Sequence, residues 1–507
     1  MQLDILPNLF AGALNLFQLW NFTLLVLGTL IGVIAGALPG IAFVNAMALA
    51  LPFAYFMSPV EAMLFLTGIY VGGIFGGSIS SILLNIPGSP GSLPATWDGY
   101  PMTKKGKSAK ALGIAITCSA IGGMFSAILM IFFAPPFANF ALTFDQPEFF
   151  AATFLGLVTV VAIAKGHMLP ALVSLFAGLI FGCVGFDFFY GAPRLTYGWD
   201  ALDGGVHFVV ALIGMFAVGE VLFTLTQNLT SDHRKLESHT KLPSIRELWA
   251  LKGTIARASG IGCIIGVIPG AGGIVGAVIS YGIEKQVSKR GDEFGTGVEE
   301  GLAAPETAKN ATTGAATIPM LTLGIPGSAA TAIMMAALML KGVNPGPILF
   351  IQGKELVYTI FAGYLVANVL IIVFGLIIAR GFSYIMRVPP SILYAMIIVL
   401  SIIGAFAVRN NVFDIYIALA FGVLSYFMKR YNIPTTPLVL GLILGPLMER
   451  FFLTSLASYV TPAEFLLRPK TAVIMGIGFL FLFWSLWPSI NALIRDARNR
   501  RNNRNGA

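Results

Sequence analysis

The sequence has little charge, and it has few of the residues that build metal centres or disulfides. Only 11% of its 507 residues are Asp, Glu, Lys or Arg, whereas an average soluble domain carries about 25%. The three cysteines, Cys118, Cys183 and Cys263, lie far apart, which excludes a disulfide framework and a zinc-type ligand spacing. The histidines are scattered, and no His-Glu-x-x-His motif occurs. These features argue against a soluble domain and a metalloenzyme.

Long uncharged runs are present instead. No charged residue lies between Asp4 and Glu61, or between Glu61 and Asp98. Four further runs lack Asp, Glu, Lys and Arg: 111–144, 356–379, 388–408 and 471–494. A membrane-crossing helix needs roughly 20 mostly apolar residues, and a β-barrel would show short alternating strands. The sequence therefore predicts an all-α polytopic membrane protein with roughly 10–14 transmembrane segments.

Lys and Arg are concentrated in a few polar segments. They are 102–111 with four Lys, 228–257 with six Lys or Arg, 284–293 with three, and the tail 495–507 with five Arg. The positive-inside rule predicts that all four are cytoplasmic, and that the poorer segments 143–149 and 186–205 lie outside. We therefore attribute the net charge of +8 to the basic cytoplasmic segments and not to an acidic partner. We expect a lipid bilayer and no nucleic acid as partner.

Segment 228–257 divides the chain into a first half, 1–227, and a second half, 258–494. IGVIAGALPG at 31–40 aligns with IGCIIGVIPG at 261–270, at an offset of 230 residues. NIPGS at 85–89 aligns with GIPGS at 324–328, at an offset of 239. Two motifs in the same order predict an internal repeat.

The loops that flank these motifs differ in charge between the halves. Loop 56–61 has no Lys or Arg, whereas its counterpart 284–293 is basic. After the motif the pattern reverses, because 102–111 is basic and 340–347 has a single Lys. Equivalent loops are therefore predicted on opposite sides of the membrane. This is an inverted-topology repeat, which places a substrate site near the bilayer midplane at broken helices.

Proline and glycine break the chain at equivalent places. Non-helical backbone at membrane depth is tolerated only where protein buries it or where it lines a wet cavity. We expect Pro87-Gly88 and Pro326-Gly327 to be the tips of two re-entrant hairpins, near 78–97 and 312–335, that enter from opposite faces. A glycine there can adopt backbone angles that other residues avoid, and can bring N–H groups close to a ligand.

The polar residues near these tips suit two kinds of ligand. Exposed N–H groups and helix N-termini attract carboxylates, whereas hydroxyl and carbonyl oxygens suit a hard cation such as Na⁺. The predicted substrate-binding residues are Ser81, Asn85, Pro87, Gly88, Ser89, Thr322, Pro326, Gly327 and Ser328. The predicted ion-binding residues are Ser78, Ser80, Asn310, Thr313 and Thr317, and the further broken-helix positions are Pro39, Gly40, Pro269 and Gly270. For any single Ser or Thr, a hydrogen bond to its own helix is the alternative.

The stretch APETAKNATTG at 304–314 is the most polar close to a break. Glu306 and Lys309 are spaced to pair on one helix face. Alternatively, they cap a helix near the cytoplasmic surface.

Four motifs together indicate a family. GALPGI, GIYVGGIFGGSISSILLNIPGSPGSLPATWDGYPM, AAPETAKNA and GIPGSAAT resemble the large membrane subunit of tripartite tricarboxylate transporters, the TctA family. The resemblance extends from about residue 20 to about residue 470. One departure is Lys309-Asn310-Ala311, where family members often show Asn-Asn-Ala; a lysine there alters a polar contact near Asn310.

The resemblance implies a secondary transporter for tricarboxylates or dicarboxylates in the bacterial inner membrane, driven by a cation gradient. It implies a small four-helix membrane subunit and a periplasmic solute-binding protein as partners. No cofactor is expected beyond Na⁺ as coupling ion.

Two other classes compete with a transporter. A passive channel for small anions would not need two mirrored broken hairpins. An intramembrane enzyme would need a nucleophile and a base, yet His167 and His207 belong to other segments than the serines. We therefore expect a transporter and not an enzyme.

Overall fold

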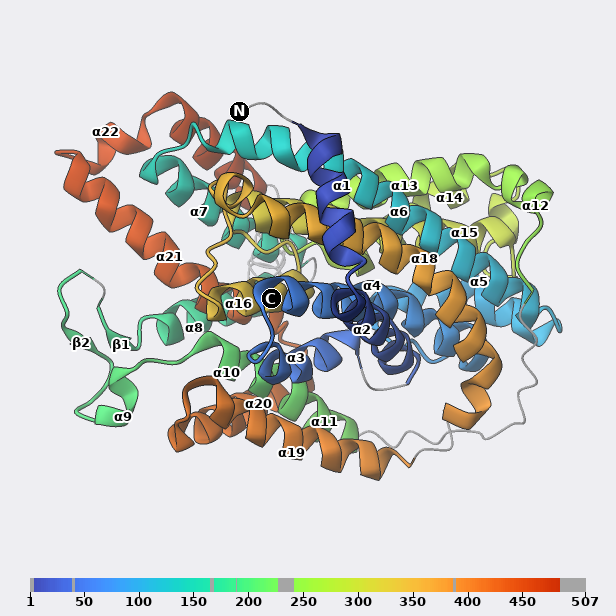
Figure 1. The fold of residues 1–507 in the computed structure, drawn as a ribbon, viewed down its shortest axis with the longest axis horizontal. Coiled ribbons are helices and arrows are strands. Elements are labelled where there is room, and N and C mark those ends of the chain that lie inside the picture. Colours follow the sequence, from blue (N-terminus) through green and yellow to red (C-terminus); the bar gives the residue numbers. More distant parts are fainter. Residues whose placement is uncertain are drawn as a thin grey trace, which may run out of the picture. The chain divides into compact units, whose positions relative to one another are not determined.

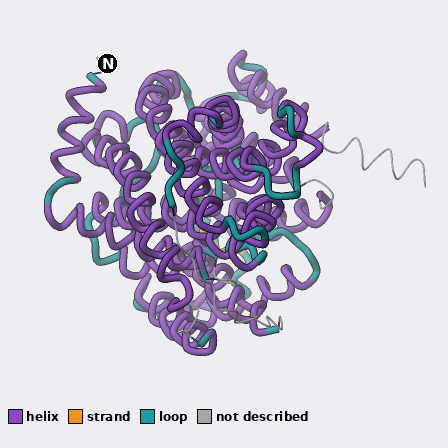
Figure 2. Tube along the Cα trace, turned by 90° about the vertical axis from the view of Figure 1, so that its right-hand side faces the viewer, coloured by secondary structure: helices purple, strands orange, loops and turns teal. Residues whose placement is uncertain are grey.

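The computed structural model describes residues 4–38, 42–164, 168–187, 189–226, 241–385 and 389–483. Figure 1 shows the order of the helices along the chain, and Figure 2 shows that helices make up most of it. Two short strands, β1 (Gly185–Phe186) and β2 (Pro193–Arg194), pair antiparallel. The predicted all-α class is confirmed. Pro39, Gly40, residues 228–240 of the linker and the tail 495–507 lie outside the described residues.

Nine helices in the described part of the chain are long and apolar enough to cross a bilayer. Five shorter apolar helices of 10–17 residues accompany them. The chain is therefore a multi-pass membrane protein. The number of crossings stays a prediction, because length alone does not decide whether the shorter helices span.

The helices divide into two compact units, and the first comprises residues 1–143 and 206–430. Its elements before the linker are α1 (Ile5–Leu16), α2 (Leu19–Ala37), α3 (Phe43–Ala54), α4 (Pro59–Leu84), η1 (Pro90–Ser92), α5 (Leu93–Lys104), α6 (Ser108–Ala141), α10 (Phe208–Ile213), η2 (Gly214–Val218) and α11 (Gly219–Leu225). From the linker onward they are α12 (Ile245–Ala250), α13 (Lys252–Val267), α14 (Gly272–Val287), η3 (Gly291–Glu293), α15 (Glu299–Leu323), α16 (Ala329–Leu340), α17 (Leu349–Gln352), α18 (Lys354–Ile385), α19 (Pro390–Arg409) and α20 (Val412–Arg430).

The second unit comprises residues 144–205 and 431–507. Besides the two strands, its elements are α7 (Gln146–Ile163), α8 (Met168–Gly182), α9 (Asp200–Asp203), α21 (Thr436–Ser458), α22 (Pro462–Leu466) and an apolar helix over Pro469–Phe483. Glycine lets α8 and α21 pack closely, since a Cβ added at Gly178 would lie 2.1 Å from the carbonyl oxygen of Leu438.

Glycine also sets the packing of corresponding helix pairs in the first unit. A Cβ added at Gly32 of α2 would lie 2.4 Å from the carbonyl oxygen of Ile69 on α4. A Cβ added at Gly262 of α13 would lie 2.3 Å from that of Ala308 on α15. The glycines are 230 residues apart (262 − 32) and the carbonyls 239 apart (308 − 69), which are the offsets of the repeated sequence motifs.

The helices α4 and α15 end in the same local structure. Asn85 follows α4 with a φ of 60°, and Gly324 follows α15 with a φ of 70°. Glycine and asparagine are the residues that adopt this left-handed conformation most readily, so both helices terminate there. The two residues are again 239 apart (324 − 85).

After each break the chain folds back along the helix that it has just left. The N–H of Gly88 donates to the carbonyl oxygen of Gly77 at 3.3 Å. A Cβ added at Gly327 would lie 2.9 Å from the carbonyl oxygen of Ala316. Both pairs are eleven residues apart and are related by the same offset of 239 (327 − 88 and 316 − 77). Because Gly77 lies seven residues before the end of α4, the segment returns about 10 Å along that helix.

The structure gives the lengths of the helices that lead into the two expected hairpins. The first arm is the end of a full-length helix, because α4 has 26 residues and α15 has 25. The short helix α5 then leads back toward the end of α4, where the Thr103 hydroxyl donates to the carbonyl oxygen of Ile82 at 2.8 Å. Their depth in a membrane stays a prediction.

Candidate functional site

A buried ion pair lies where α4, α6 and α15 meet. The Lys309 Nζ of α15 donates to Glu306 Oε1 at 3.0 Å, and each side chain is only 1% exposed. The Glu306 carboxylate also accepts a hydrogen bond from Ser78 of α4 at 2.7 Å and one from Ser119 of α6 at 2.9 Å. The predicted pairing is therefore observed, and the alternative of a surface cap is wrong.

The first folded-back segment reaches this ion pair. Ser92, the last residue of η1, accepts a hydrogen bond from Lys309 Nζ at 3.3 Å, and Lys309 Nζ also donates to Ser78 Oγ. The hydroxyls of Ser89 and Ser92 are 3.0 Å apart. Lys309, Ser78, Ser89, Ser92, Ser119 and Glu306 thus form one polar group, which we call the lysine cluster.

A second polar group lies at the other folded-back segment. The hydroxyls of Ser328 and Thr331 are 3.2 Å apart, and the Tyr70 hydroxyl of α4 is 3.5 Å from Ser328 Oγ. Ser328 and Thr331 follow Ser89 and Ser92 by 239 residues, and Tyr70 precedes Lys309 by 239 (309 − 70). We call Tyr70, Ser328 and Thr331 the tyrosine cluster. By this offset, the Tyr70 phenol of the tyrosine cluster is the counterpart of the Lys309 ammonium in the lysine cluster.

One contact within each cluster gives the relative direction of α4 and α15. Ser78 contacts Glu306, near the start of α15. Tyr70, eight residues earlier on α4 (78 − 70), contacts Ser328, whose neighbour Gly327 packs on Ala316. Moving backward along α4 therefore corresponds to moving forward along α15, so the two helices run antiparallel.

Asn310 follows Lys309 on α15 and places a second polar side chain in the protein interior. Its Nδ2 donates to the carbonyl oxygen of Ser119 at 2.7 Å and to Asn368 Oδ1 at 3.2 Å. Its Oδ1 is buried and has no hydrogen-bond partner within the described residues. Buried polar atoms are normally paired, so this oxygen is an open acceptor. A carbonyl oxygen of this kind fits the donor set of a hard cation such as Na⁺.

Most of the other predicted Ser and Thr residues bond to their own helix. Thr317 Oγ1 also lies 2.6 Å from the Tyr364 hydroxyl of α18. Hydroxyls that donate to a backbone carbonyl three or four residues earlier are those of Ser80, Ser81, Thr313, Thr317 and Thr322. A hydrogen bond to the residue's own helix was the alternative to ligand binding for each Ser or Thr. In the structure, the O–H of each of these five residues donates to such a carbonyl.

The backbone angles of the glycines at the two tips do not require glycine. Neither Gly88 nor Gly327 has a positive φ; the left-handed residues are Asn85 and Gly324, three positions earlier. A Cβ added at Gly88 would lie 2.2 Å from the carbonyl oxygen of Gly36. The physical need for glycine at residue 88 is therefore close packing of backbone on α2, and the expected positive φ is wrong at both tips.

The PGAGG segment at 269–273 contacts both folded-back segments. Gly270, with a φ of 82°, donates its N–H to the carbonyl oxygen of Gly327 at 2.9 Å. A Cβ added at Gly91 would lie 3.5 Å from the backbone carbonyl carbon of Gly273. Pro269 and Gly270 are half-buried, as are Pro87 and Ser328, whereas Pro326 is buried. The PGAGG segment thus lies between the two folded-back segments and contacts both.

Several polar residues of the site were missed by sequence reasoning. Four such residues contact predicted site residues: Ser119, Asn368, Tyr70 and Tyr364. Asn368 lies inside the uncharged run 356–379 and Ser119 inside 111–144, so a polar side chain in an apolar run was the available signal.

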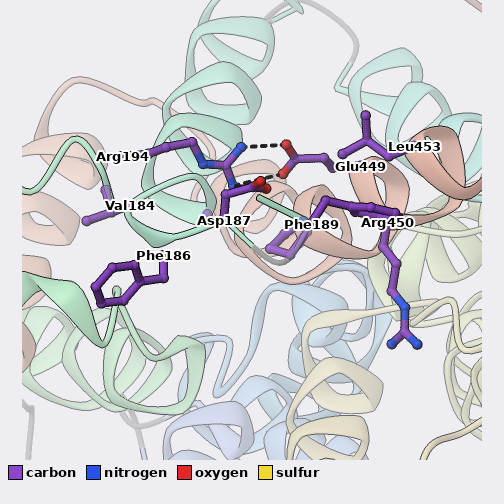
Figure 3. A pocket seen from close by; sticks show the side chains of 10 residues that line it. Val184, Phe186, Asp187, Phe189, Arg194, Glu449, Arg450 and Leu453 are labelled. Atoms are coloured by element: carbon purple, nitrogen blue, oxygen red, sulfur yellow. Dashed lines mark hydrogen bonds and ion pairs between the residues drawn. The ribbon is translucent and has the colours of Figure 1, made fainter. Parts of the chain in front are cut away.

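The second unit has a charged pocket of its own, shown in Figure 3. Arg194 of β2 donates to both carboxylate oxygens of Glu449 on α21, at 2.5 and 3.1 Å, and lies 3.7 Å from Asp187. Two carboxylates therefore balance this arginine, and the pocket offers no net positive charge from these three side chains.

The fold and the buried polar clusters define a polytopic membrane protein with broken helices, the class to which transporter subunits belong. The model of the tripartite tricarboxylate transporter TctA family matches residues 22–440, so this chain belongs to that family. It is a component of a membrane transporter rather than an enzyme, and the family resemblance is confirmed.

Two relatives come from Agrobacterium vitis. One, described as "Uncharacterized 52.8 kDa protein in TAR-I ttuC' 3'region", is 33% identical over 498 residues, which cover 97% of this chain and 98% of the relative. The other, "Uncharacterized protein in TAR-II ttuC' 3'region", is 34% identical over 232 residues, 46% of this chain and 96% of the relative. No solved structure is significantly similar to this chain.

Proposed function

We propose that this chain is the large membrane subunit of a cation-coupled uptake system for a tricarboxylate or dicarboxylate. A periplasmic binding protein delivers the substrate, and a small four-helix membrane subunit completes the complex in the bacterial inner membrane. The observation that carries the proposal is the pair of matched broken helices, each followed by a serine-bearing segment that folds back into a polar cluster.

Contacts among the loops support an inverted repeat. Lys110 lies 3.1 Å from Glu247 of the linker and 2.5 Å from Glu299, and Arg290 lies 3.6 Å from Glu300. Three basic segments proposed as cytoplasmic therefore gather together. Lys341 of loop 340–347 lies over the Tyr55 ring at 5.2 Å, beside loop 56–61, and both of these loops are proposed as periplasmic. The antiparallel course of α4 and α15 agrees with this arrangement.

The chemistry of Asn310 and of the two folded-back segments supports separate roles for ion and substrate. Asn310 Oδ1 is a buried open acceptor and so suits a cation, with Thr313 and Thr317 on the same helix. The carboxylate substrate suits the segments at Ser89 and Ser328, where short helices begin after each break. We propose Na⁺ as the coupling cation, because hard cations take oxygen ligands.

A binding measurement tests the ion site. Asn310→Leu removes the open oxygen and the Nδ2 donor, whereas Asn310→Gln keeps an amide oxygen and an amide N–H donor. If Asn310 holds the coupling ion, the leucine variant should lose Na⁺-dependent substrate affinity and the glutamine variant should keep more of it. Equal Na⁺ dependence in wild type and in a folded leucine variant would show that Asn310 is not a ligand.

A transport assay distinguishes the proposed transporter from a passive channel and from an intramembrane enzyme. A channel only equilibrates the substrate, and an enzyme alters it. Uphill accumulation of unchanged carboxylate is the result expected of the proposed function.

A further inference from the structure

We propose that the ammonium of Lys309 is a tethered cation, held in a ligand set that would otherwise bind an alkali-metal ion such as Na⁺. The inference deepens the proposed cation-coupled function, because it identifies one polar site that needs no ion from solution. It rests on the geometry of the lysine cluster, where the end of one side chain meets oxygens from three separate segments.

The ligands of the ammonium match its donors in number. A lysine ammonium has three N–H donors and no acceptor. Lys309 Nζ donates to Glu306 Oε1 at 3.0 Å, to Ser92 Oγ at 3.3 Å, and to Ser78 Oγ. Every donor therefore has an acceptor, although the residue is only 1% exposed. These oxygens are one carboxylate and two hydroxyls, which are ligands that a hard cation also takes.

The charge of the site is balanced within the protein. Glu306 is the carboxylate that the ammonium contacts, and its remaining hydrogen bonds come from neutral Ser78 and Ser119 hydroxyls. Removing the positive charge would leave a buried carboxylate without its partner, which is strongly unfavourable. A small cation that enters the vacated space restores the balance and uses the same oxygens.

The position of the lysine gives it a mechanical role. Lys309 and Glu306 are on α15, Ser78 is on α4, and Ser92 is at the end of the first folded-back segment. At the equivalent place in the other half, Tyr70 contacts Ser328 through a neutral hydroxyl. The chain therefore has a covalently attached ammonium at one of two equivalent contacts, and its hydrogen bonds join the first segment to α15.

Cation-dependent stability of Lys309→Ala tests the proposal without any substrate. Wild-type protein, K309A, and the charge-retaining control K309R are purified in detergent. Their thermal unfolding is followed while NaCl replaces choline chloride at constant ionic strength. We expect Na⁺ to raise the unfolding midpoint of K309A by about 2 °C or more beyond its effect on wild type. K309R should behave like wild type, because a guanidinium still supplies the charge.

A double variant identifies the ligand that holds the free ion. Glu306→Gln combined with K309A removes the carboxylate, so the additional Na⁺ effect should disappear. A folded K309A whose midpoint responds to NaCl as wild type does would overturn the proposal. If K309A does not fold in either salt, Lys309→Ser repeats the test with a hydroxyl oxygen in the same space. Failure of both variants to fold in NaCl also overturns it, because a free cation must be able to replace the ammonium.

The outcome is separate from that of the proposed function. If the complex does not transport a carboxylate, the cation effect on K309A can still be present. If transport is cation-coupled and K309A shows no added Na⁺ effect, only the tethered-cation inference fails.

Discussion

Replacing Gly88 by alanine tests a close backbone approach in the candidate site. The added Cβ would lie 2.2 Å from the carbonyl oxygen of Gly36 and 2.8 Å from the Cα of Gly77. Contacts under 3.0 Å are essentially never seen, so the segment must move at least 0.8 Å (3.0 − 2.2) away from α2. Overpacking of this kind costs about 1–3 kcal/mol, and loss of the Gly88–Gly77 hydrogen bond adds about 1 kcal/mol.

A matched control lies three residues away in the same segment. A Cβ added at Gly91 would lie 3.4 Å or more from its neighbours, which is ordinary contact. We therefore expect Gly88→Ala to lower the thermal unfolding midpoint clearly, and Gly91→Ala to change stability by no more than about 0.5 kcal/mol. Purified, size-homogeneous variants in detergent are compared by thermal unfolding.

The same samples decide between packing and ligand contact at Gly88. If packing is the role of this glycine, substrate affinity per folded molecule stays normal in both variants. Wild-type stability of Gly88→Ala together with weakened affinity would refute the packing role, and would place the tip against the substrate instead. Equal destabilisation by both substitutions would contradict the close approach to α2.

Three further predictions concern the loops and the helix ends. Single cysteines at Ser108 and Ser288 should be labelled only from the cytoplasm and one at Val343 only from the periplasm; labelling of Ser288 and Val343 from one side would exclude the inverted repeat. The buried Asp98 carboxylate accepts hydrogen bonds from the N–H groups of Gly295, Gly297 and Val298 and from the Tyr281 hydroxyl. Asp98→Ala should therefore lower the free energy of unfolding by about 3 kcal/mol, and Asp98→Asn should lower it less. An unchanged unfolding midpoint in Asp98→Ala would contradict this network. The Ser244 N–H donates to Glu247 and lowers its pKa from 4.5 to about 2, so this carboxylate stabilises the fold fully above pH 4.5 and loses the effect as the pH falls toward about 2. The difference in unfolding midpoint between Glu247→Gln and wild type should accordingly be constant above pH 4.5 and narrow below it; a difference that widens in acid would show the opposite linkage.

Much of the fold was readable from two short motifs. Pro-Gly pairs and the offsets of 230 and 239 located the breaks, because backbone that cannot continue a helix has a strong local signature. The same offsets relate Asn85 to Gly324 and Gly32 to Gly262 in the structure. Local chemistry of this kind depends on few neighbours, so the sequence reports it well.

Contacts across the chain were not readable in the same way. Glu306 meets Ser78 across 228 residues and Ser119 across 187. No periodicity or spacing brings these three together, since their approach depends on how α4, α6 and α15 pack. The close packing of Gly88 was not readable for a similar reason: the atom that requires a glycine there belongs to Gly36, on another helix.

Uptake into proteoliposomes tests the proposed transport function most directly. The probe is a radiolabelled form of the carboxylate that the proposed periplasmic binding protein retains on purification. The complete complex should accumulate it unchanged above its external concentration, only with an inward cation gradient and only when the binding protein is present. Simple equilibration would indicate a channel, chemical conversion an enzyme, and full-rate uphill uptake by this chain alone would contradict the three-component system.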